Sequence, residues 1–475
     1  MKFSFKGVLL LLFVGLWVTA CQPDDFTDNP DAVLGFSADT LTFDTVFTTV
    51  GSTTGFFKIY NTERKALKIS SIQLGGGENS MFRINVNGTP GSTATDVEIG
   101  GNDSLYVFVE VTVDPNQEDL PFLVTDSIMF NTNGNEQQIK LVAYGQNAHY
   151  FNDQAVEGIE VFENDRPYLV YNRLRVNPNS TLTLKEGVRF FMHPGACIEV
   201  QGTLNLEGEL DSMIVFEGDR LEDYFDDLPA QWNGIYVARG GVVNMNYTHI
   251  NESTDGVFLG FLPKKDTIEI QAGNPPQLNI QNSIISNCLS RNILGLRSVV
   301  QATNCQFTNS SLYNIELALG GLYDFQHCTI VNYGGGAISH RDPILRMANY
   351  AALGGTLFSG DDLTVEYKNC IIHGSEDEEI FFDILSEEDG GLPINYTFNH
   401  CLLKTEIDTA GNNAYVNCIL NPASSDTLFV DRFEEDFHLN NEAPAINAGI
   451  LSTISTDFDG IPRDGEPDLG CYEFQ

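Results

Sequence analysis

Positive charge is scarce in this chain. The 475 residues contain 25 Lys and Arg against 65 Asp and Glu, which gives a formal net charge of −40. This balance excludes a nucleic-acid-binding protein that works by neutralising phosphates, and it argues against electrostatic docking on anionic lipid. A hydrophobic content of 42% excludes wholesale disorder, and the length favours two or three domains.

Cysteine is absent between residues 22 and 196, although the chain has nine in all. A domain in this region must therefore be held by packing alone. Residues 34–147 contain seven short alternating runs separated by Gly, Asn and Asp, which is typical of a β-sandwich. The runs are 41–47, 56–61, 67–74, 82–86, 105–113, 126–132 and 138–145. Segments such as FDTVFTTVGS and FKIYNTERKALKISSIQL resemble immunoglobulin-like domains of the ASH/MSP type, which implies a spacer or interaction module.

Residues 1–20 are predicted to be an export signal. Lys2 and Lys6 precede an apolar run, Val8–Val18, that is too short for a stable membrane span. The sequence V-T-A-C, ending at Cys21, resembles the lipobox of bacterial lipoproteins. The resemblance implies that Cys21 is lipidated and becomes the new N-terminus, which anchors the chain to a membrane. A soluble secreted protein with an incidental Cys21 is the alternative.

Residues 21–33 form a short acidic tether. Asp24 and Asp25 close to the lipidated cysteine resemble the signal that exports Bacteroidetes-type lipoproteins to the outer face of the outer membrane. We therefore expect the protein to be lipid-anchored in the outer membrane and to face the cell exterior. A polar tether of any kind is the simpler alternative.

A repeat over residues 165–475 predicts a solenoid. Each unit is Asn or His, then a small residue or Cys, then a short apolar strand. The units start at Asn282, Asn304, His327, Asn369, His400 and Asn417, with spacings of 22, 23, 42, 31 and 17 residues. One coil of a parallel β-helix needs about 20–25 residues, so most spacings fit one or two coils. A second row at Asn287, Asn309 and Asn332 lies five residues later. Asn side chains stacked at a turn can bond to one another along the solenoid.

Five cysteines occupy the second position of the unit: Cys305, Cys328, Cys370, Cys401 and Cys418. No C-x-x-C pair accompanies them, so the spacing does not favour a zinc site. We expect a buried stack of small side chains, with disulfides between adjacent coils as the alternative.

The ends of this region resemble a known family. Residues 176–216 and QWNGIYV at 231–237 resemble the opening coils of right-handed parallel β-helix proteins of the pectate-lyase-like superfamily. Residues 445–474 resemble the closing segment of bacterial surface β-helix proteins, with Ala443 and Cys471 in place of the usual Ser and Ala. The predicted fold class is thus all-β: an Ig-like sandwich at 34–147, then a right-handed parallel β-helix with a C-terminal cap at 165–475. The resemblance implies a fold and no particular activity.

Catalytic motifs are largely missing. The N-T-D, G-H-G and R-I-K motifs of polygalacturonase-type hydrolases do not occur. A lyase of this fold needs a basic residue beside bound calcium. His340 and Arg341, which open a long insertion, are the candidates for that role, and Arg291, Arg297 and Arg346 are further basic residues nearby in sequence. The alternative is a solvated loop with a local ion pair.

Two further sets of residues are candidates for ligands. A calcium site could use the carboxylates of DFDGIPRDGEPD, although the same residues suit an end cap rich in Asx-turns: Asp457, Asp459, Asp464 and Asp468. Aromatic rings near the insertion could line a glycan groove, although packing roles are the alternative: Tyr333, Tyr350 and Phe358.

Asp followed by Ser or Thr and then an apolar residue occurs eight times, where composition predicts roughly two. The aspartates are Asp39, Asp44, Asp103, Asp126, Asp211, Asp266, Asp408 and Asp426. The pattern resembles the O-glycosylation acceptor motif of Bacteroidetes-type exported proteins. A loop Asp that opens a β-strand explains part of the excess.

The sequence therefore predicts an outer-membrane surface lipoprotein whose β-helix binds carbohydrate or another extracellular ligand without catalysis. A calcium-dependent polysaccharide lyase is the first alternative, and a purely structural or adhesive protein is the second. No nucleic-acid partner is expected, and calcium is the one cofactor that the residues suggest.

Overall fold

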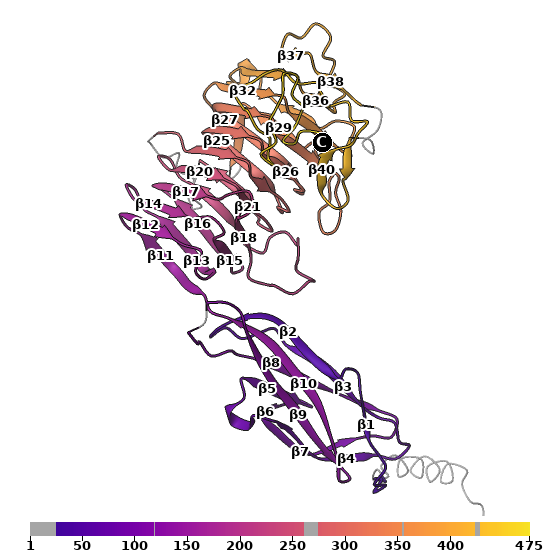
Figure 1. The fold of residues 1–475 in the computed structure, drawn as a ribbon. Coiled ribbons are helices and arrows are strands. Elements are labelled where there is room, and N and C mark those ends of the chain that lie inside the picture. The colour runs from indigo at the N-terminus through magenta and orange to yellow at the C-terminus, as the bar shows by residue number, and fades with distance from the viewer. Residues whose placement is uncertain (1–24, 118, 261–273, 354–355, 423–427) are drawn as a thin grey trace, which may run out of the picture. The chain divides into compact units, whose positions relative to one another are not determined.

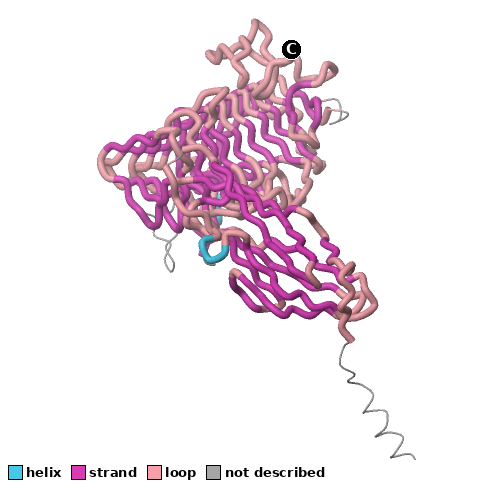
Figure 2. Tube along the Cα trace, turned by 60° about the horizontal axis from the view of Figure 1, so that its bottom comes forward, coloured by secondary structure: helices cyan, strands magenta, loops and turns pink. Residues whose placement is uncertain are grey.

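The computed structural model describes residues 25–117, 119–260, 274–353, 356–422 and 428–475. Strands and loops make up nearly all of the described residues (Figure 2), which also contain two short 3-10 helices, η1 (Gly77–Asn79) and η2 (Glu387–Asp389). The chain divides into two compact units, Met1–Asn147 and Ala148–Gln475. In the part of the chain that the structure describes, no helix has the length and apolar character needed to cross a membrane. The predicted signal and Cys21 lie outside the described residues.

The N-terminal unit is a β-sandwich of two five-stranded sheets. One sheet has the order β1 (Leu34–Phe36), β3 (Gly55–Asn61), β8 (Ser104–Val111), β5 (Phe82–Val86), β6 (Thr89–Gly91). The other has the order β2 (Thr40–Phe47), β10 (Asn135–Gln146), β9 (Phe122–Thr132), β4 (Leu67–Leu74), β7 (Thr93–Ile99). Neighbouring strands are antiparallel except β2 and β10, which run parallel.

All seven predicted strands of the sandwich are present. Their alternating apolar residues meet in one core between the sheets, which includes Phe57, Ile69, Phe82, Val109 and Phe130. Because this core is continuous and buried, the unit holds together without a disulfide among its described residues.

The C-terminal unit is a parallel β-helix solenoid whose strands form three faces, stacked coil on coil (Figure 1). We call them faces 1, 2 and 3, in the order in which the chain visits them. Face 1 consists of β15 (Arg189–Met192), β18 (Ile214–Gly218), β21 (Thr248–Ile250), β24 (Ile284–Ile285), β26 (Gln306–Thr308), β28 (Thr329–Asn332), β33 (Ile371–Gly374), β36 (Leu402–Leu403) and β38 (Ile419–Leu420).

Face 2 consists of β16 (Cys197–Val200), β19 (Gly234–Val237), β22 (Asp255–Leu259), the first halves of β25 (Arg291–Thr303) and β27 (Tyr313–Gln326), β29 (Leu345–Ala348) and β34 (Ile380–Asp383). Face 3 consists of β12 (Ile159–Phe162), β14 (Thr181–Leu184), β17 (Thr203–Glu207), β20 (Val242–Asn246), β23 (Gln277–Gln281), the second halves of β25 and β27, β32 (Leu363–Lys368), β35 (Ile394–Asn399) and β37 (Tyr415–Val416).

The parallel sheet starts earlier than the predicted residue 165. Strands β11 (His149–Val156) and β13 (Tyr168–Val176) run through faces 1 and 2 and pair with each other. Strand β11 belongs to the terminal coil, so no coil covers its outer edge and most of its side chains are exposed or half-buried. Its sequence therefore lacks the apolar alternation that marks the inner coils.

The repeating Asn and His mark the corner between faces 3 and 1. All six of these residues have positive φ, between 47° and 55°, a conformation that Asn adopts more readily than most residues. Their side chains also bond from coil to coil: Asn304 Nδ2 donates to Asn282 Oδ1 (3.2 Å), and Asn369 Nδ2 to His327 Nε2 (2.9 Å). Backbone geometry and stacking together explain the repeat.

The five cysteines of the repeat unit are free thiols. Four of them are fully buried, and Cys418 near the last coil is half-buried. Burial raises the pKa of Cys328, Cys370 and Cys401 well above the ordinary value. These three thiols are therefore an unreactive part of the core.

The last residues of the chain cover face 1. The hairpin of β39 (Phe429–Asp431) and β40 (Asp436–Leu439) and the segment after it bring Phe437, Leu469 and Tyr472 against Val331 and Ile371 of the face. The outer side of face 1 is therefore covered, whereas the alternate side chains of β17, β20 and β23 on face 3 are half-buried or exposed.

Candidate functional site

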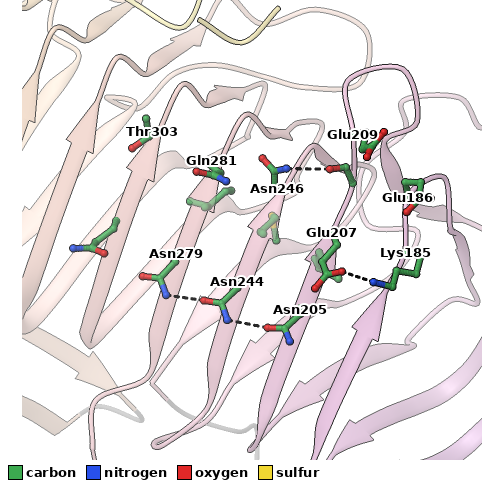
Figure 3. A pocket seen from close by; sticks show the side chains of 15 residues that line it. Lys185, Glu186, Asn205, Glu207, Glu209, Asn244, Asn246, Asn279, Gln281 and Thr303 are labelled. Atoms are coloured by element: carbon green, nitrogen blue, oxygen red, sulfur yellow. Dashed lines mark hydrogen bonds and ion pairs between the residues drawn. The ribbon is translucent and has the colours of Figure 1, made fainter. Parts of the chain in front are cut away.

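The outer surface of face 3 contains a groove of about 860 Å³. It crosses four successive strands, β17, β20, β23 and the second half of β25, and its ends are marked by Lys185 and Thr303 (Figure 3). In each strand the apolar side chains point into the core, and the alternate polar side chains form the groove floor. The volume lies in the range of ligand pockets.

A row of amides runs along the groove floor. Asn205, Asn244 and Asn279 occupy the same register position in three adjacent coils. Asn244 Nδ2 donates to Asn205 Oδ1 (2.9 Å), and Asn279 Nδ2 donates to Asn244 Oδ1 (2.8 Å), as Figure 3 shows. We call these three residues the amide row. Gln301 is at the same register in the next coil.

The charged residues of the described lining lie at one end of the groove (Figure 3). Lys185 Nζ pairs with Glu207 Oε2 at 2.6 Å, and Glu186 and Glu209 lie beside this pair. Asn246, Gln281 and Thr303 form the remaining polar lining. The floor is therefore neutral and amide-rich, and its charged end is acidic.

A second, smaller hollow of about 450 Å³ lies further along face 3. Its lining includes Glu366, Asn395, Tyr396 and Asn412. Face 3 thus carries polar hollows at two places along the solenoid.

The predicted catalytic pair is split. His340 Nε2 contacts Glu379 Oε1 at 3.0 Å, and the two side chains are 1% and 0% exposed. Arg341, the next residue, is exposed. A buried and paired imidazole cannot contact a polymer in solution. His340 therefore forms a local ion pair, as in the alternative, but the pair lies in the core and not in a solvated loop.

Two of the other basic candidates lie together on face 2. Arg346 bonds Glu316 and pairs with Asp383 at 2.5 Å, and Arg291 bonds the same Glu316. The hydroxyl of Tyr350 donates to Asp383 at 2.9 Å. This network ties the hairpin of β30 (Tyr350–Leu353) and β31 (Thr356–Ser359) to the solenoid. Arg297 pairs with Asp361 instead.

The three candidate aromatic residues do not form one groove. Tyr333 packs beneath the C-terminal hairpin, with its hydroxyl 3.0 Å from His373 Nδ1 and its ring against Phe429 and Phe437. Tyr350 belongs to the network on face 2. The backbone of Phe358 pairs with Ala351 in the hairpin, and its side chain lies outside the described set. Tyr333 therefore fits the packing alternative.

The four candidate calcium ligands serve the end cap. Asp457 accepts backbone N–H groups from Ile461 (2.7 Å) and Glu473 (2.8 Å), and Asp468 accepts those of Asn447 and Phe474 (2.6 Å each). Asp464 accepts the N–H of Glu466, and Asp459 contacts His438. Within the described residues no group of three or more His, Cys, Asp or Glu side chains is placed to hold a metal ion. The aspartates are thus not brought together as a calcium site.

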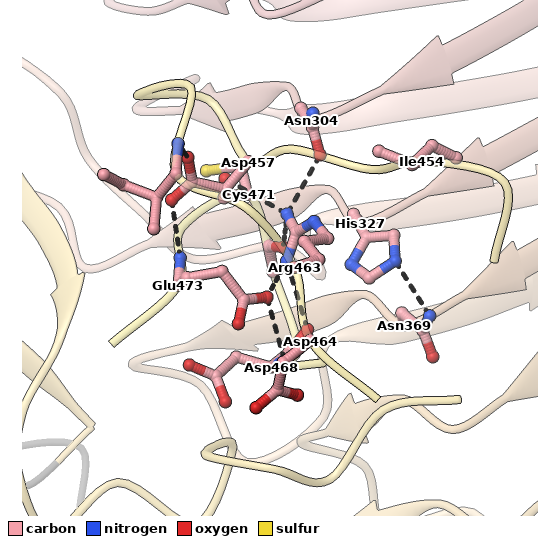
Figure 4. Close-up of polar contacts among 12 residues, drawn as sticks. Asn304, His327, Asn369, Ile454, Asp457, Arg463, Asp464, Asp468, Cys471 and Glu473 are labelled. Atoms are coloured by element: carbon pink, nitrogen blue, oxygen red, sulfur yellow. Dashed lines mark hydrogen bonds and ion pairs between the residues drawn. The ribbon is translucent and has the colours of Figure 1, made fainter. Parts of the chain in front are cut away.

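Arg463 is the centre of this cap (Figure 4). Its guanidinium donates to Glu473 Oε1 (2.5 Å), to Asn304 Oδ1 (2.9 Å) and to the carbonyl of Gly470 (3.1 Å). Asn304 belongs to the corner row of the solenoid. The closing motif of the sequence therefore fastens the C-terminal segment to that row.

Glu252 and Glu435 are two carboxyl groups of the C-terminal unit whose pKa is raised to about 7. Burial raises the pKa of Glu252 to about 7, against two backbone N–H donors that lower it. Burial and the charge of Asp227 raise the pKa of Glu435 to about 7 as well, and Asn309 donates to this carboxyl at 2.5 Å.

These shifts predict a pH-dependent stability. A carboxyl that titrates near 4.5 when unfolded and near 7 when folded binds more protons in the native state across that interval, so its contribution declines as pH rises from about 4.5 to about 7. Urea unfolding of wild type and Glu435→Gln at a series of pH values measures the effect. The stability of wild type relative to the variant should decrease over this window, and a constant difference between the two would contradict the prediction.

No family model and no curated protein matches the sequence. The matching solved structures include a family 123 glycoside hydrolase from Clostridium perfringens, at 9% identity over 26% of this chain and 31% of that one, with a TM-score of 0.18. They also include the YadV chaperone (8% identity, 24% and 51% covered, TM-score 0.17) and the periplasmic chaperone SfaE (14%, 25% and 66%, TM-score 0.17). The chain spans under a third of the length of the hydrolase. Similarity at this level carries no argument about activity.

The sequence contains a signal for the groove that is easily overlooked. The strands TLNLE (203–207), VVNMN (242–246) and QLNIQ (277–281) all have Asn at the third position and a polar residue at the fifth. Alternate residues of a strand face outward. If these three strands stack in adjacent coils, the Asn residues at their third positions form a row.

Proposed function

We propose that this protein binds carbohydrate at the cell surface and has no catalytic role there. The observation that carries the proposal is the groove on face 3, which presents amide donors and acceptors at regular intervals along an open surface. Sugar hydroxyls both donate and accept hydrogen bonds. A side-chain amide can bond to them in both ways, because its N–H groups donate and its oxygen accepts. A glycan chain is the ligand whose chemistry matches this lining most fully.

We further propose that the β-helix belongs to a surface lipoprotein of the pectate-lyase-like superfamily. The lipobox at Cys21 and the acidic tether support an anchor in the outer membrane with the chain facing the exterior. The sandwich then acts as a spacer of the ASH/MSP type. Six of the eight Asp-Ser/Thr sites lie in the described residues, where the Ser or Thr is partly exposed in every case; Asp266 and Asp426 lie outside them. Their exposure supports O-glycosylation.

Affinity electrophoresis tests the proposal. The chain from residue 22 is run through gels that contain soluble polysaccharides, with and without calcium, and the same mixtures are followed by ultraviolet absorbance for unsaturated products. We expect retardation by at least one polysaccharide and flat absorbance. Flat absorbance without retardation on any gel would contradict glycan binding, and a calcium-dependent rise in absorbance would establish a lyase in its place.

A further inference from the structure

The amide row on the floor of the face 3 groove has hydrogen-bonding capacity that its own contacts do not use. Within the amide row, Asn244 donates one N–H to Asn205 and accepts one N–H from Asn279, and Asn205 donates to the hydroxyl of Thr183. An amide has two N–H donors and an oxygen with two acceptor positions. One donor and one acceptor position are therefore left at Asn244, the inner member of the row, for a ligand in the groove.

The spacing of the row fits a polymer laid along the solenoid axis. Adjacent parallel strands lie about 4.8 Å apart, so equivalent side chains of successive coils repeat at that interval. An extended chain of pyranose units repeats at a similar interval. Such a chain places one sugar over each coil, and the four strands of the groove accommodate about four sugars.

The charge of the groove disfavours an acidic polymer. Among the described residues that line the groove, Lys185 is the one lysine; it is paired with Glu207, and Glu186 and Glu209 remain. The part of the lining that the structure describes thus carries one positive formal charge against three negative, in a chain of net charge −40. The acidic lining and the net negative charge of the protein both repel a polyanion. Neither of them repels a neutral glycan.

We infer that the face 3 groove is a subsite for a neutral polysaccharide, with one sugar hydrogen-bonded to each of the stacked side chains Asn205, Asn244, Asn279 and Gln301. This inference rests on the proposed function and adds the ligand class, the orientation of the chain and the residues that read it. None of the described residues that line the groove is aromatic, so hydrogen bonds rather than ring stacking provide the recognition.

Isothermal titration calorimetry of the chain from residue 22 tests the inference. The probes are cello-, malto-, xylo- and manno-oligosaccharides from disaccharide to hexasaccharide, and oligogalacturonates of the same lengths. We expect one neutral series to bind, with affinity that rises with length up to about the tetrasaccharide and then levels off. Oligogalacturonates should bind at least about tenfold more weakly.

Asn244→Ala provides the site-specific test, because Asn244 is bonded to both neighbours in the row. Loss of its contacts should weaken binding of the tetrasaccharide by about tenfold or more. Gln154→Ala, an exposed amide on β11 outside the groove, is the matched control and should leave the affinity unchanged. Circular dichroism verifies that each variant is folded. Asn279→Ala serves as a second variant if Asn244→Ala is not folded.

The outcomes separate the inference from the proposed function. Binding of oligogalacturonates alone would overturn the inference and leave glycan binding in place. Binding of a neutral series that a folded Asn244→Ala or Asn279→Ala variant does not weaken would also overturn it. Failure of every series, together with failure of the polysaccharide gels, would overturn both.

Discussion

Replacing Arg463 with alanine is expected to lower the free energy of unfolding of the solenoid by about 3–5 kcal/mol, because the replacement breaks a buried ion pair and leaves its partner without a counter-charge. The side chain of Arg463 is 2% exposed and that of Glu473 is 10% exposed. The variant also leaves the oxygen of Asn304 and the carbonyl of Gly470 without their donor. Buried acceptors without a partner add to the cost.

Urea unfolding followed by the fluorescence of Trp232 measures this loss. The chain has two tryptophans, and one of them, Trp17, lies in the predicted signal, so the chain from residue 22 reports through Trp232 alone. Trp232 is fully buried in the solenoid. Arg341→Ala is the control, since Arg341 is exposed. An Arg463→Ala variant as stable as this control would contradict the role of the cap.

The second large effect is expected at the buried pair of His340 and Glu379. His340→Ala leaves the carboxylate of Glu379 buried without its partner, and the expected loss at neutral pH is again about 3–5 kcal/mol. Glu379 also accepts the backbone N–H of Glu376 (3.0 Å) and of Ile344 (3.2 Å), so it holds the insertion against the solenoid. Burial raises the pKa of Glu379, opposed by His340.

The pH dependence of this loss identifies its cause. In the His340→Ala variant a buried Glu379 becomes neutral by taking up a proton as pH falls, so the loss should shrink toward low pH. Urea unfolding of the variant and of wild type at neutral and mildly acidic pH gives the comparison. An equal loss of stability at both pH values would indicate that lost packing, and not the unpaired charge of Glu379, destabilises the variant. A stability equal to wild type at both would contradict the account of the pair.

The strands of the sandwich could be predicted where burial imposes alternation. The runs at 67–74 and 82–86 were predicted with the bounds that the structure has. Strand β7 was missed because it is an edge strand, and most of its side chains are exposed or half-buried. Strands β1 and β6 have three residues each, which is too short for a period to appear.

The solenoid could be predicted where the corner between faces 3 and 1 requires Asn or His. The positive φ at Asn282 and Asn304 restricts the residue type, so the repeat is visible in the sequence. The corner before β15 uses Gly187 at φ 73° instead, and the early coils therefore lack the marker. Local backbone geometry decides which coils can be recognised.

The groove could not be predicted from residue types alone. Asn205 and Asn244 are 39 positions apart, and only the register of β17 with β20 brings them together. The aromatic candidate Tyr333 lies near the insertion in sequence, but the C-terminal hairpin returns over face 1 and packs on it. Contacts between segments so distant in the chain depend on the number of coils that separate them. The irregular spacing of the sequence repeat does not reveal that number.

The measurement that tests the central claim most directly is a crystal structure of the chain from residue 22 in complex with the tightest-binding oligosaccharide from the calorimetry. The account predicts a sugar chain on face 3, parallel to the solenoid axis, with hydroxyls in hydrogen-bond contact with Asn205, Asn244 and Asn279. A sugar chain bound on face 2, beside Arg346 and Tyr350, would contradict it.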